Sequence, residues 1–172
     1  EEETVVIFVS DNGGFAKAAH MGPLKGAKSS TLEGGIRVPL IIRWPGRIEA
    51  GKTSNQVCAT FDLTRSILNL AGAKVPAKKL DGIDVVDHLI QKKPDFKRTL
   101  YWRGKRGVRT WWAVRDGDVK YVRKTEGETE EWLYDLSKDV GETKDLSQAK
   151  PKQVVRLKKM LAKWEKEVQP IR

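Results

Sequence analysis

Apolar residues recur along this chain in two different patterns, one near each end. Near the start, the unbroken apolar run at residues 5–9 predicts a strand buried on both faces, and residues 38–43 predict a second buried strand. Near the end, apolar residues return every three or four positions, which predicts an amphipathic helix beginning near Pro151. The buried stripe of that helix should consist of Val154, Leu157, Leu161, Trp164 and Val168.

Between these ends, the pattern changes from helical to strand-like. Residues 62–71 place Leu63, Ile67 and Leu70 on one helical face, and residues 85–90 predict a short helical turn. Short β-rich segments then predict four strands, at 99–103, 110–115, 119–123 and 131–136. An Asp-Gly-Asp sequence between the second and third is typical of a hairpin turn. The chain should therefore have an α/β fold that ends in a small antiparallel sheet and one long amphipathic helix.

Four tryptophans fall within the predicted strands, interleaved with lysines and arginines: Trp102, Trp111, Trp112 and Trp132. Large aromatic side chains usually form core, so we expect them between the sheet and the last helix. The alternative is a surface that stacks on sugars or bases.

The chain is strongly basic, with 33 Lys and Arg against 23 Asp and Glu and a formal net charge of +10. Because these residues are spread along the chain, a solvated basic surface is the favoured interpretation, and attraction to polyanions is the alternative. No nucleic-acid partner is expected. No apolar run approaches the roughly 20 residues that cross a bilayer, so no membrane partner is expected either.

The first predicted strand ends in a polar turn, Ser10-Asp11-Asn12-Gly13-Gly14. This turn places a carboxylate and a carboxamide side by side at the carboxyl end of a core strand, where ligands bind in open α/β sheets. Their hard oxygens suit Ca²⁺ or Mg²⁺. The alternative is a plain turn, because Asp, Asn and Gly are common turn residues.

Further motifs follow this turn in order: Lys28, then Glu-Gly-Gly-Ile-Arg-Val-Pro at 33–39, Trp-Pro-Gly at 44–46, and Leu-Tyr-Asp-Leu-Ser-Lys-Asp-Val-Gly-Glu-Thr-Lys-Asp-Leu at 133–146. Together with the Ser-Asp-Asn-Gly turn, they resemble the sulfatase family of the alkaline-phosphatase-like superfamily. The resemblance covers nearly the whole chain. It implies that residues 1–97 are the C-terminal part of a sulfatase-like catalytic sheet and domain, and that residues 98–172 are a C-terminal subdomain.

The resemblance also implies roles for particular residues. Asp11 and Asn12 would ligate a divalent cation, Ca²⁺ or alternatively Mg²⁺, and Lys28 would contact the substrate sulfate. Lys25 and His20 are further candidates for substrate binding.

The loop before the second strand is interpreted as structural. We expect its glycines, Gly34 and Gly35, to serve turn geometry, and Glu33 and Arg37 to form an ion pair.

One departure from the family is large. Sulfatases use a formylglycine nucleophile made from a Cys or Ser in a Cys/Ser-x-Pro/Ala-x-Arg motif, and the single cysteine, Cys58, is followed by Ala-Thr-Phe-Asp. No serine fits the motif, and the family's paired N-terminal aspartates are missing. We therefore expect the C-terminal portion of a longer sulfatase, inactive without the N-terminal part of the same polypeptide. A periplasmic or secreted location is compatible with the resemblance.

The implied reaction of the parent enzyme is hydrolysis of a sulfate ester or sulfamate on a small molecule or a glycan. Two alternatives stay open. One is a fragment of a related phosphodiesterase or phosphonate hydrolase, and the other is a non-catalytic basic module that binds polyanions.

Overall fold

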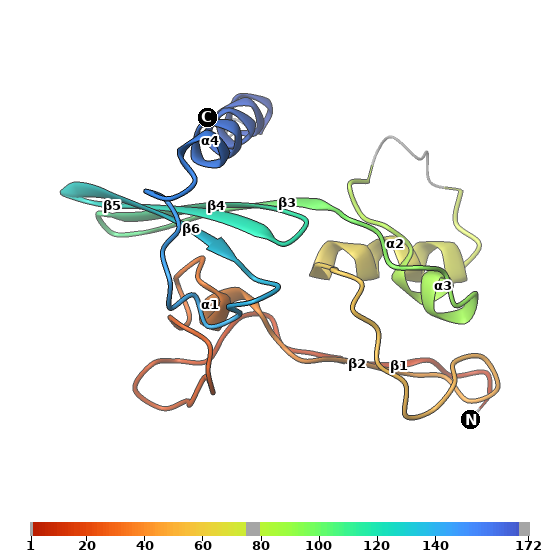
Figure 1. The fold of residues 1–172 in the computed structure, drawn as a ribbon. Helices are drawn as coiled ribbons and strands as arrows, with labels where there is room; N and C mark the ends of the chain where they lie inside the picture. Colours follow the sequence, from red (N-terminus) through yellow and green to blue (C-terminus); the bar gives the residue numbers. More distant parts are fainter. Residues whose placement is uncertain (1, 75–79, 169–172) are drawn as a thin grey trace. The chain divides into compact units, whose positions relative to one another are not determined.

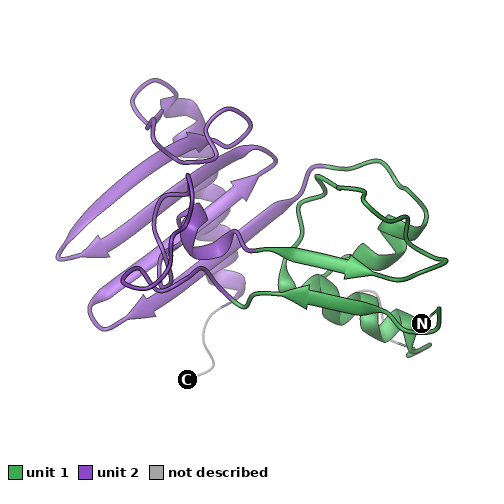
Figure 2. Ribbon diagram, turned by 90° about the horizontal axis from the view of Figure 1, so that it is seen from below, with its two compact units in different colours: residues 1–11, 39–96 green, residues 12–38, 97–172 purple. Residues whose placement is uncertain are grey.

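The computed structural model describes residues 2–74 and 80–168. The chain forms two compact units (Figure 2). Unit 1 comprises Glu1–Asp11 and Pro39–Phe96, and unit 2 comprises Asn12–Val38 and Lys97–Arg172. Within the described residues, no helix is long and apolar enough to cross a membrane.

The described part of unit 1 contains a small sheet and two helices. Strands β1 (Val6–Val9) and β2 (Leu40–Arg43) pair antiparallel. Helices α2 (Thr60–Leu70) and α3 (Val85–Ile90) follow, close to the positions that the sequence predicts.

The burial predicted for β1 is wrong for unit 1. Exposure alternates along the strand, and Val6 and Phe8 are 50% and 61% exposed. The partner strand is similar, with Ile41 at 61%. The physical reason is that β1 and β2 form a sheet of two strands, and the faces of such a sheet are buried only where other segments pack on them.

The buried face predicted for α2 is also wrong. Ile67 is 52% and Leu70 41% exposed, whereas Asp62 and Ser66 are fully buried. The Asp62 carboxylate accepts the Ile83 N–H over 2.8 Å, and the Ser66 hydroxyl accepts the Val86 N–H over 3.3 Å. Hydrogen bonds to the segment around α3 therefore decide which face of α2 turns inward.

Unit 2 is built on a four-stranded antiparallel sheet in the order β3-β4-β5-β6 (Figure 1). The strands are β3 (Thr99–Arg106), β4 (Arg109–Asp116), β5 (Val119–Glu126) and β6 (Glu128–Asp135). The predicted hairpin at 116–118 is confirmed, with Gly117 in a left-handed conformation at φ 62°. Helix α4 (Pro151–Glu167) begins at the predicted proline.

The two faces of this sheet have different coverings (Figure 1). Leu157 and Leu161 of α4 pack on one face, against Val114, Tyr121 and Leu133. On the opposite face, Leu32 from the loop before helix α1 (Glu33–Ile36) packs against Trp111, Ala113, Val122, Tyr134 and Leu136. We call these the helix face and the loop face.

The tryptophans divide between these faces. Trp112 packs with the α4 cluster, as predicted, but Trp102, Trp111 and Trp132 belong to the loop face. The prediction that all four lie between sheet and helix is therefore wrong for three of them. Side chains alternate along strands, so neighbours such as Trp111 and Trp112 must point to opposite faces.

Candidate functional site

The turn that follows β1 contains Asp11, which is exposed, and Asn12, which is half-buried. Gly13 comes next and is buried, and its N–H donates to the Gly35 carbonyl oxygen over 2.9 Å. A Cβ at Gly13 would lie 1.8 Å from the Gly34 carbonyl oxygen, so only glycine permits this approach. The chain directly after the Asp-Asn pair is therefore held against the Glu-Gly-Gly segment.

Gly34 and Gly35 are needed for close packing rather than for turn geometry, which corrects the prediction. Neither has a positive φ. A Cβ at Gly34 would lie 2.3 Å from the Gly26 carbonyl oxygen, and one at Gly35 would lie 2.3 Å from the Ser30 carbonyl oxygen. The absence of side chains lets two stretches of backbone pack together.

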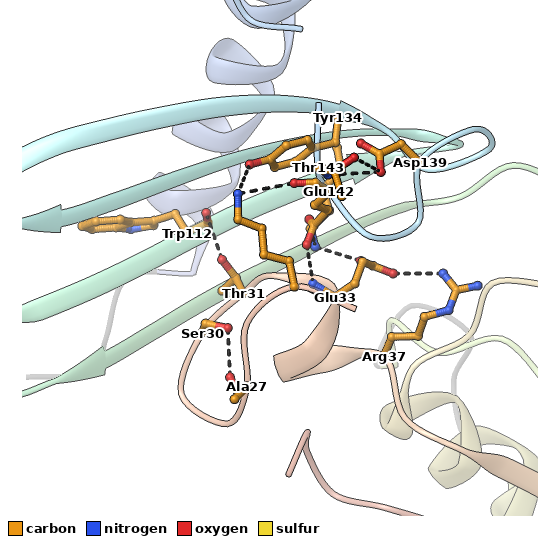
Figure 3. A network of polar contacts seen from close by, with 12 residues as sticks. Ala27, Ser30, Thr31, Glu33, Arg37, Trp112, Tyr134, Asp139, Glu142 and Thr143 are labelled. Atoms are coloured by element: carbon orange, nitrogen blue, oxygen red, sulfur yellow. Dashed lines mark hydrogen bonds and ion pairs between the residues drawn. The ribbon is translucent and has the colours of Figure 1, made fainter. Parts of the chain in front are cut away.

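Lys28 lies in the same loop, and its backbone N–H donates to the Gly14 carbonyl oxygen over 3.0 Å. The residue itself is exposed. Ser29, which follows, has a left-handed backbone with φ 78°, uncommon for a residue other than glycine. The Ser30 hydroxyl donates to the Ala27 carbonyl oxygen over 2.9 Å and braces the turn (Figure 3). The loop thus exposes Lys28 to solvent on a turn that is hydrogen-bonded to Gly14.

The two further candidates, Lys25 and His20, are held by contacts of their own. The Lys25 amine lies 3.4 Å from both the Tyr134 hydroxyl and the Glu142 carbonyl oxygen, so it joins the loop to β6 and the segment that follows. Nδ1 of the exposed His20 accepts the Gly22 N–H over 3.1 Å and closes a local turn. A role in substrate binding stays a prediction for both residues.

Three buried charged residues meet between the loop and the sheet, and Figure 3 labels two of them, Glu33 and Glu142. Lys120 of β5 and Glu142, after β6, are 0% exposed, and Glu33 is 2% exposed. The Lys120 amine lies 2.8 Å from one carboxylate oxygen of Glu33 and 2.8 Å from one of Glu142. The second Glu142 oxygen accepts the Glu33 backbone N–H over 2.7 Å. We call these residues, together with Arg37, the Lys120 network.

Arg37 completes the network from its solvent side. Its Nη1 donates to Glu33 over 3.0 Å, which confirms the ion pair expected from the sequence. The contact between Lys120 and Glu142 is an ion pair without hydrogen-bond geometry. The network fastens the first residue of α1 to the middle of the sheet.

The two carboxyl groups of the network differ in acidity. Burial raises the pKa of Glu142, and the charge of Lys120 only partly offsets this. Burial also opposes the charge on Glu33, but the Lys120 and Arg37 charges and hydrogen bonds outweigh it and lower the pKa of Glu33. Glu142 therefore protonates before Glu33 as the pH falls.

The metal expected at Asp11 and Asn12 fits these residues as part of a larger ligand set. Within residues 2–74 and 80–168, no group of three or more His, Cys, Asp or Glu could hold a metal ion. Asp11 and Asn12 offer hard oxygens from adjacent positions, and Ca²⁺ takes about 6–8 oxygen ligands. Most of the oxygen ligands would therefore have to come from groups other than these two side chains.

The family model and the curated relatives indicate one family. A family model described as N-sulphoglucosamine sulphohydrolase, C-terminal, matches residues 27–169. A protein named Sulfatase from Formosa agariphila is 36% identical over 167 residues, covering 88% of this chain and 30% of that protein. Human arylsulfatase A is 34% identical over 84% of this chain and 34% of its own length.

A solved structure gives the same result for the fold. The crystal structure of Ps i-CgsB in complex with k-i-k-neocarrahexaose matches 95% of this chain and 36% of its own, with a TM-score of 0.82 and 30% identity. The mixed α/β fold, with its antiparallel sheets and C-terminal helix, is thus that of a sulfatase C-terminal portion. The chain belongs to the sulfatase family and corresponds to its C-terminal region. It spans between 30% and 36% of the length of these three relatives.

Proposed function

We propose that this chain is the C-terminal part of an enzyme that hydrolyses sulfate esters or sulfamates. Family membership supports the class of reaction. The observation on which the proposal for this chain depends is the exposed Lys28 on a fixed turn. An ammonium group there neutralises a bound sulfate and stabilises the charge that develops on oxygen in the transition state.

The remaining assignments follow from the same family pattern. Asp11 and Asn12 supply oxygen ligands to Ca²⁺, with Mg²⁺ as the alternative. The bound cation would supply Lewis-acid polarisation of the sulfate oxygens. Residues 1–97 form part of the catalytic domain, and residues 98–172 support its loop. The sequence has no Cys/Ser-x-Pro/Ala-x-Arg motif, so we expect no turnover from this chain alone.

The substrate class we propose is a sulfated glycan. The relative that was crystallised with k-i-k-neocarrahexaose supports an oligosaccharide ligand for this chain as well. The basic composition, with a net charge of +10, favours an anionic one.

The test is a Lys28→Ala substitution in the full-length protein, with kcat/KM for 4-nitrophenyl sulfate as the measurement. We expect a loss of about 10²–10³-fold, the usual effect of removing one group that stabilises a developing oxyanion. Lys17→Ala is the matched control, because Lys17 is an exposed lysine of the same loop, and it should leave the rate unchanged. A fully active Lys28→Ala enzyme would refute the assignment.

An Asp11→Ala substitution separates the enzyme from the polyanion-binding alternative. If Asp11 is a ligand, Ca²⁺ titration of the full-length protein should show weakened binding, and hydrolysis should fall in parallel. Salt-sensitive retention on heparin that is unchanged by Asp11→Ala, in a protein without sulfatase activity, would favour the alternative.

A further inference from the structure

The loop face of the unit 2 sheet continues beyond Leu32 toward the β3–β4 hairpin. Strand pairing places Gly104 opposite Trp111, and Trp111 belongs to the cluster that Leu32 covers. Because side chains alternate, Trp102, Gly104 and Arg106 of β3 all lie on this same face. Near the hairpin, this face therefore combines an aromatic ring, a glycine and a cation.

Arg106 links this part of the loop face to the Lys28 turn. Its Nη1 donates to the Ser29 hydroxyl over 3.2 Å, and Ser29 directly follows Lys28. Arg106 is exposed, and a guanidinium has several N–H donors in a planar fork, so the bond to Ser29 leaves others for a bound anion. The hairpin thus places a second cation in contact with Ser29, the residue that follows the proposed sulfate-binding lysine.

Gly104 leaves open space next to Arg106. It is an exposed residue within β3, without a positive φ, and a Cβ built on it would meet no heavy atom within 4 Å. Trp102, two residues away on the same face, is only half-buried. Sugar rings pack their apolar faces on aromatic side chains, and charge-assisted hydrogen bonds hold their anionic groups.

Two carboxylates of the neighbouring strands, those of Glu126 and Glu130, are paired with cations other than Arg106. Glu126 accepts two hydrogen bonds of 2.7 Å from Arg109, and Lys124 lies 2.9 Å from Glu130. These carboxylates are therefore already neutralised by partners other than Arg106.

We propose that Arg106, together with the open space next to Gly104, forms a second anion subsite of the substrate site. It would hold a sulfate or carboxylate on the sugar next to the one whose sulfate contacts Lys28. The ligand class is an oligosaccharide with at least two anionic groups. This inference rests on the proposed function and extends it, and a substrate with a single anion does not use the subsite.

Calorimetric titration tests the subsite without turnover when the full-length protein carries alanine in place of its formylglycine-precursor residue, so that neither probe is hydrolysed. The probes are a heparin-derived tetrasaccharide, with several anionic groups, and 4-nitrophenyl sulfate, with one. Arg106→Gln should raise the Kd of the tetrasaccharide about tenfold, as for the loss of one charge-assisted contact, and leave that of the aryl sulfate unchanged. Lys105→Gln is the matched control. Lys105 is the residue before Arg106 in β3, so this substitution removes the same charge from the opposite face of the sheet.

Gly104→Thr is a second, charge-neutral test. The open space and the strand position accommodate threonine, so the fold should be kept while the open space of the subsite is filled. We expect the Kd of the tetrasaccharide to rise and the Kd of the aryl sulfate to stay unchanged.

Four results would overturn the subsite. These are no tetrasaccharide binding by the wild type, equal losses for both probes on Arg106→Gln, equal effects of Lys105→Gln and Arg106→Gln, or no effect of Arg106→Gln. Equal losses for both probes would show that Arg106 acts only through Ser29 on the Lys28 turn. If the tetrasaccharide results hold but the unmodified protein hydrolyses neither sulfate esters nor sulfamates, the proposed function fails and the subsite stands.

Discussion

Replacing Lys120 by methionine tests whether the Lys120 network stabilises unit 2. Lys120 is 0% exposed, and its amine lies 2.8 Å from carboxylate oxygens of both Glu33 and Glu142. Methionine keeps most of the side-chain volume but leaves both carboxylates buried without this partner. Breaking a buried ion pair from one side costs about 3–5 kcal/mol. Arg37 still neutralises Glu33, but its side chain is 49% exposed, so solvent screens that contact.

We therefore expect Lys120→Met to lower the free energy of unfolding at neutral pH by at least about 3 kcal/mol. Guanidinium denaturation followed by tryptophan fluorescence measures it. Lys163→Met is the control, because the Lys163 side chain is 82% exposed and its loss should change stability by about 0.5 kcal/mol or less. Equal losses for the two variants would refute a stabilising network.

A combined variant separates charge from packing. Adding Glu33→Gln and Glu142→Gln to Lys120→Met leaves no unpaired buried carboxylate, so part of the lost stability should return. If nothing returns, the loss comes from the packing of the lysine side chain rather than from its charge.

Three further predictions concern the fold. Leu161→Asp should lower the melting temperature far more than Lys163→Asp, because Leu161 is 1% exposed and an unpaired carboxylate is costly there; equal shifts would contradict the packing of α4. Gly13→Ala should melt lower than Gly104→Ala, because a Cβ at Gly13 meets a carbonyl oxygen at 1.8 Å and one at Gly104 meets nothing within 4 Å; the reverse order would contradict the loop packing. Burial raises the pKa of Glu142, so its protonated form stabilises the fold below the ordinary value of 4.5, and this contribution is lost as the pH rises through the folded-state pKa. The free energy of unfolding of the wild type, minus that of Glu142→Gln, should therefore decrease as the pH rises from below 4.5 to neutral. Denaturation at a series of pH values measures this difference, and a difference that stays constant would contradict the prediction.

The C-terminal sheet and helix could be predicted because local periodicity marks them. Leu157 and Leu161, in the predicted stripe of α4, are 0% and 1% exposed. The ends of the strands could not be predicted as well. β6 begins at Glu128 rather than at 131, because pairing with β5 keeps exposed polar residues in strand conformation without burial.

The burial of Lys120 could not be predicted, because its partners lie far away in the sequence. Glu33 is separated from it by 87 residues, and Glu142 lies in a polar loop without a local pattern. Both faces of β5 are covered in this region, so no alternation of polar and apolar residues distinguishes Lys120. A lysine in a strand ordinarily indicates a solvated face, and only the position of its partners reverses that.

The candidate site was predicted from motifs, but the features that hold its loop were not. Sequence motifs identified Lys28 and the Glu-Gly-Gly segment as part of the loop. The left-handed Ser29 and the contact of Arg106 with its hydroxyl depend on tertiary structure. Since Arg106 lies 77 residues from Ser29, no local pattern could have indicated it.

The apolar residues of unit 1 show how a sequence pattern and the observed burial can differ. The run at residues 5–9 is typical of a strand covered on both faces, yet Phe8 is 61% exposed, as is Ile41 on the neighbouring strand. Apolar periodicity is a property of the sequence, whereas burial depends on which segments pack against the strand. In unit 2, both faces of the sheet are covered by other segments, with Leu161 packed on one face and Leu32 on the other. The exposed side chains of β1 and β2 therefore show that an apolar run predicts strand conformation, whereas the burial of its side chains depends on segments that no local pattern identifies.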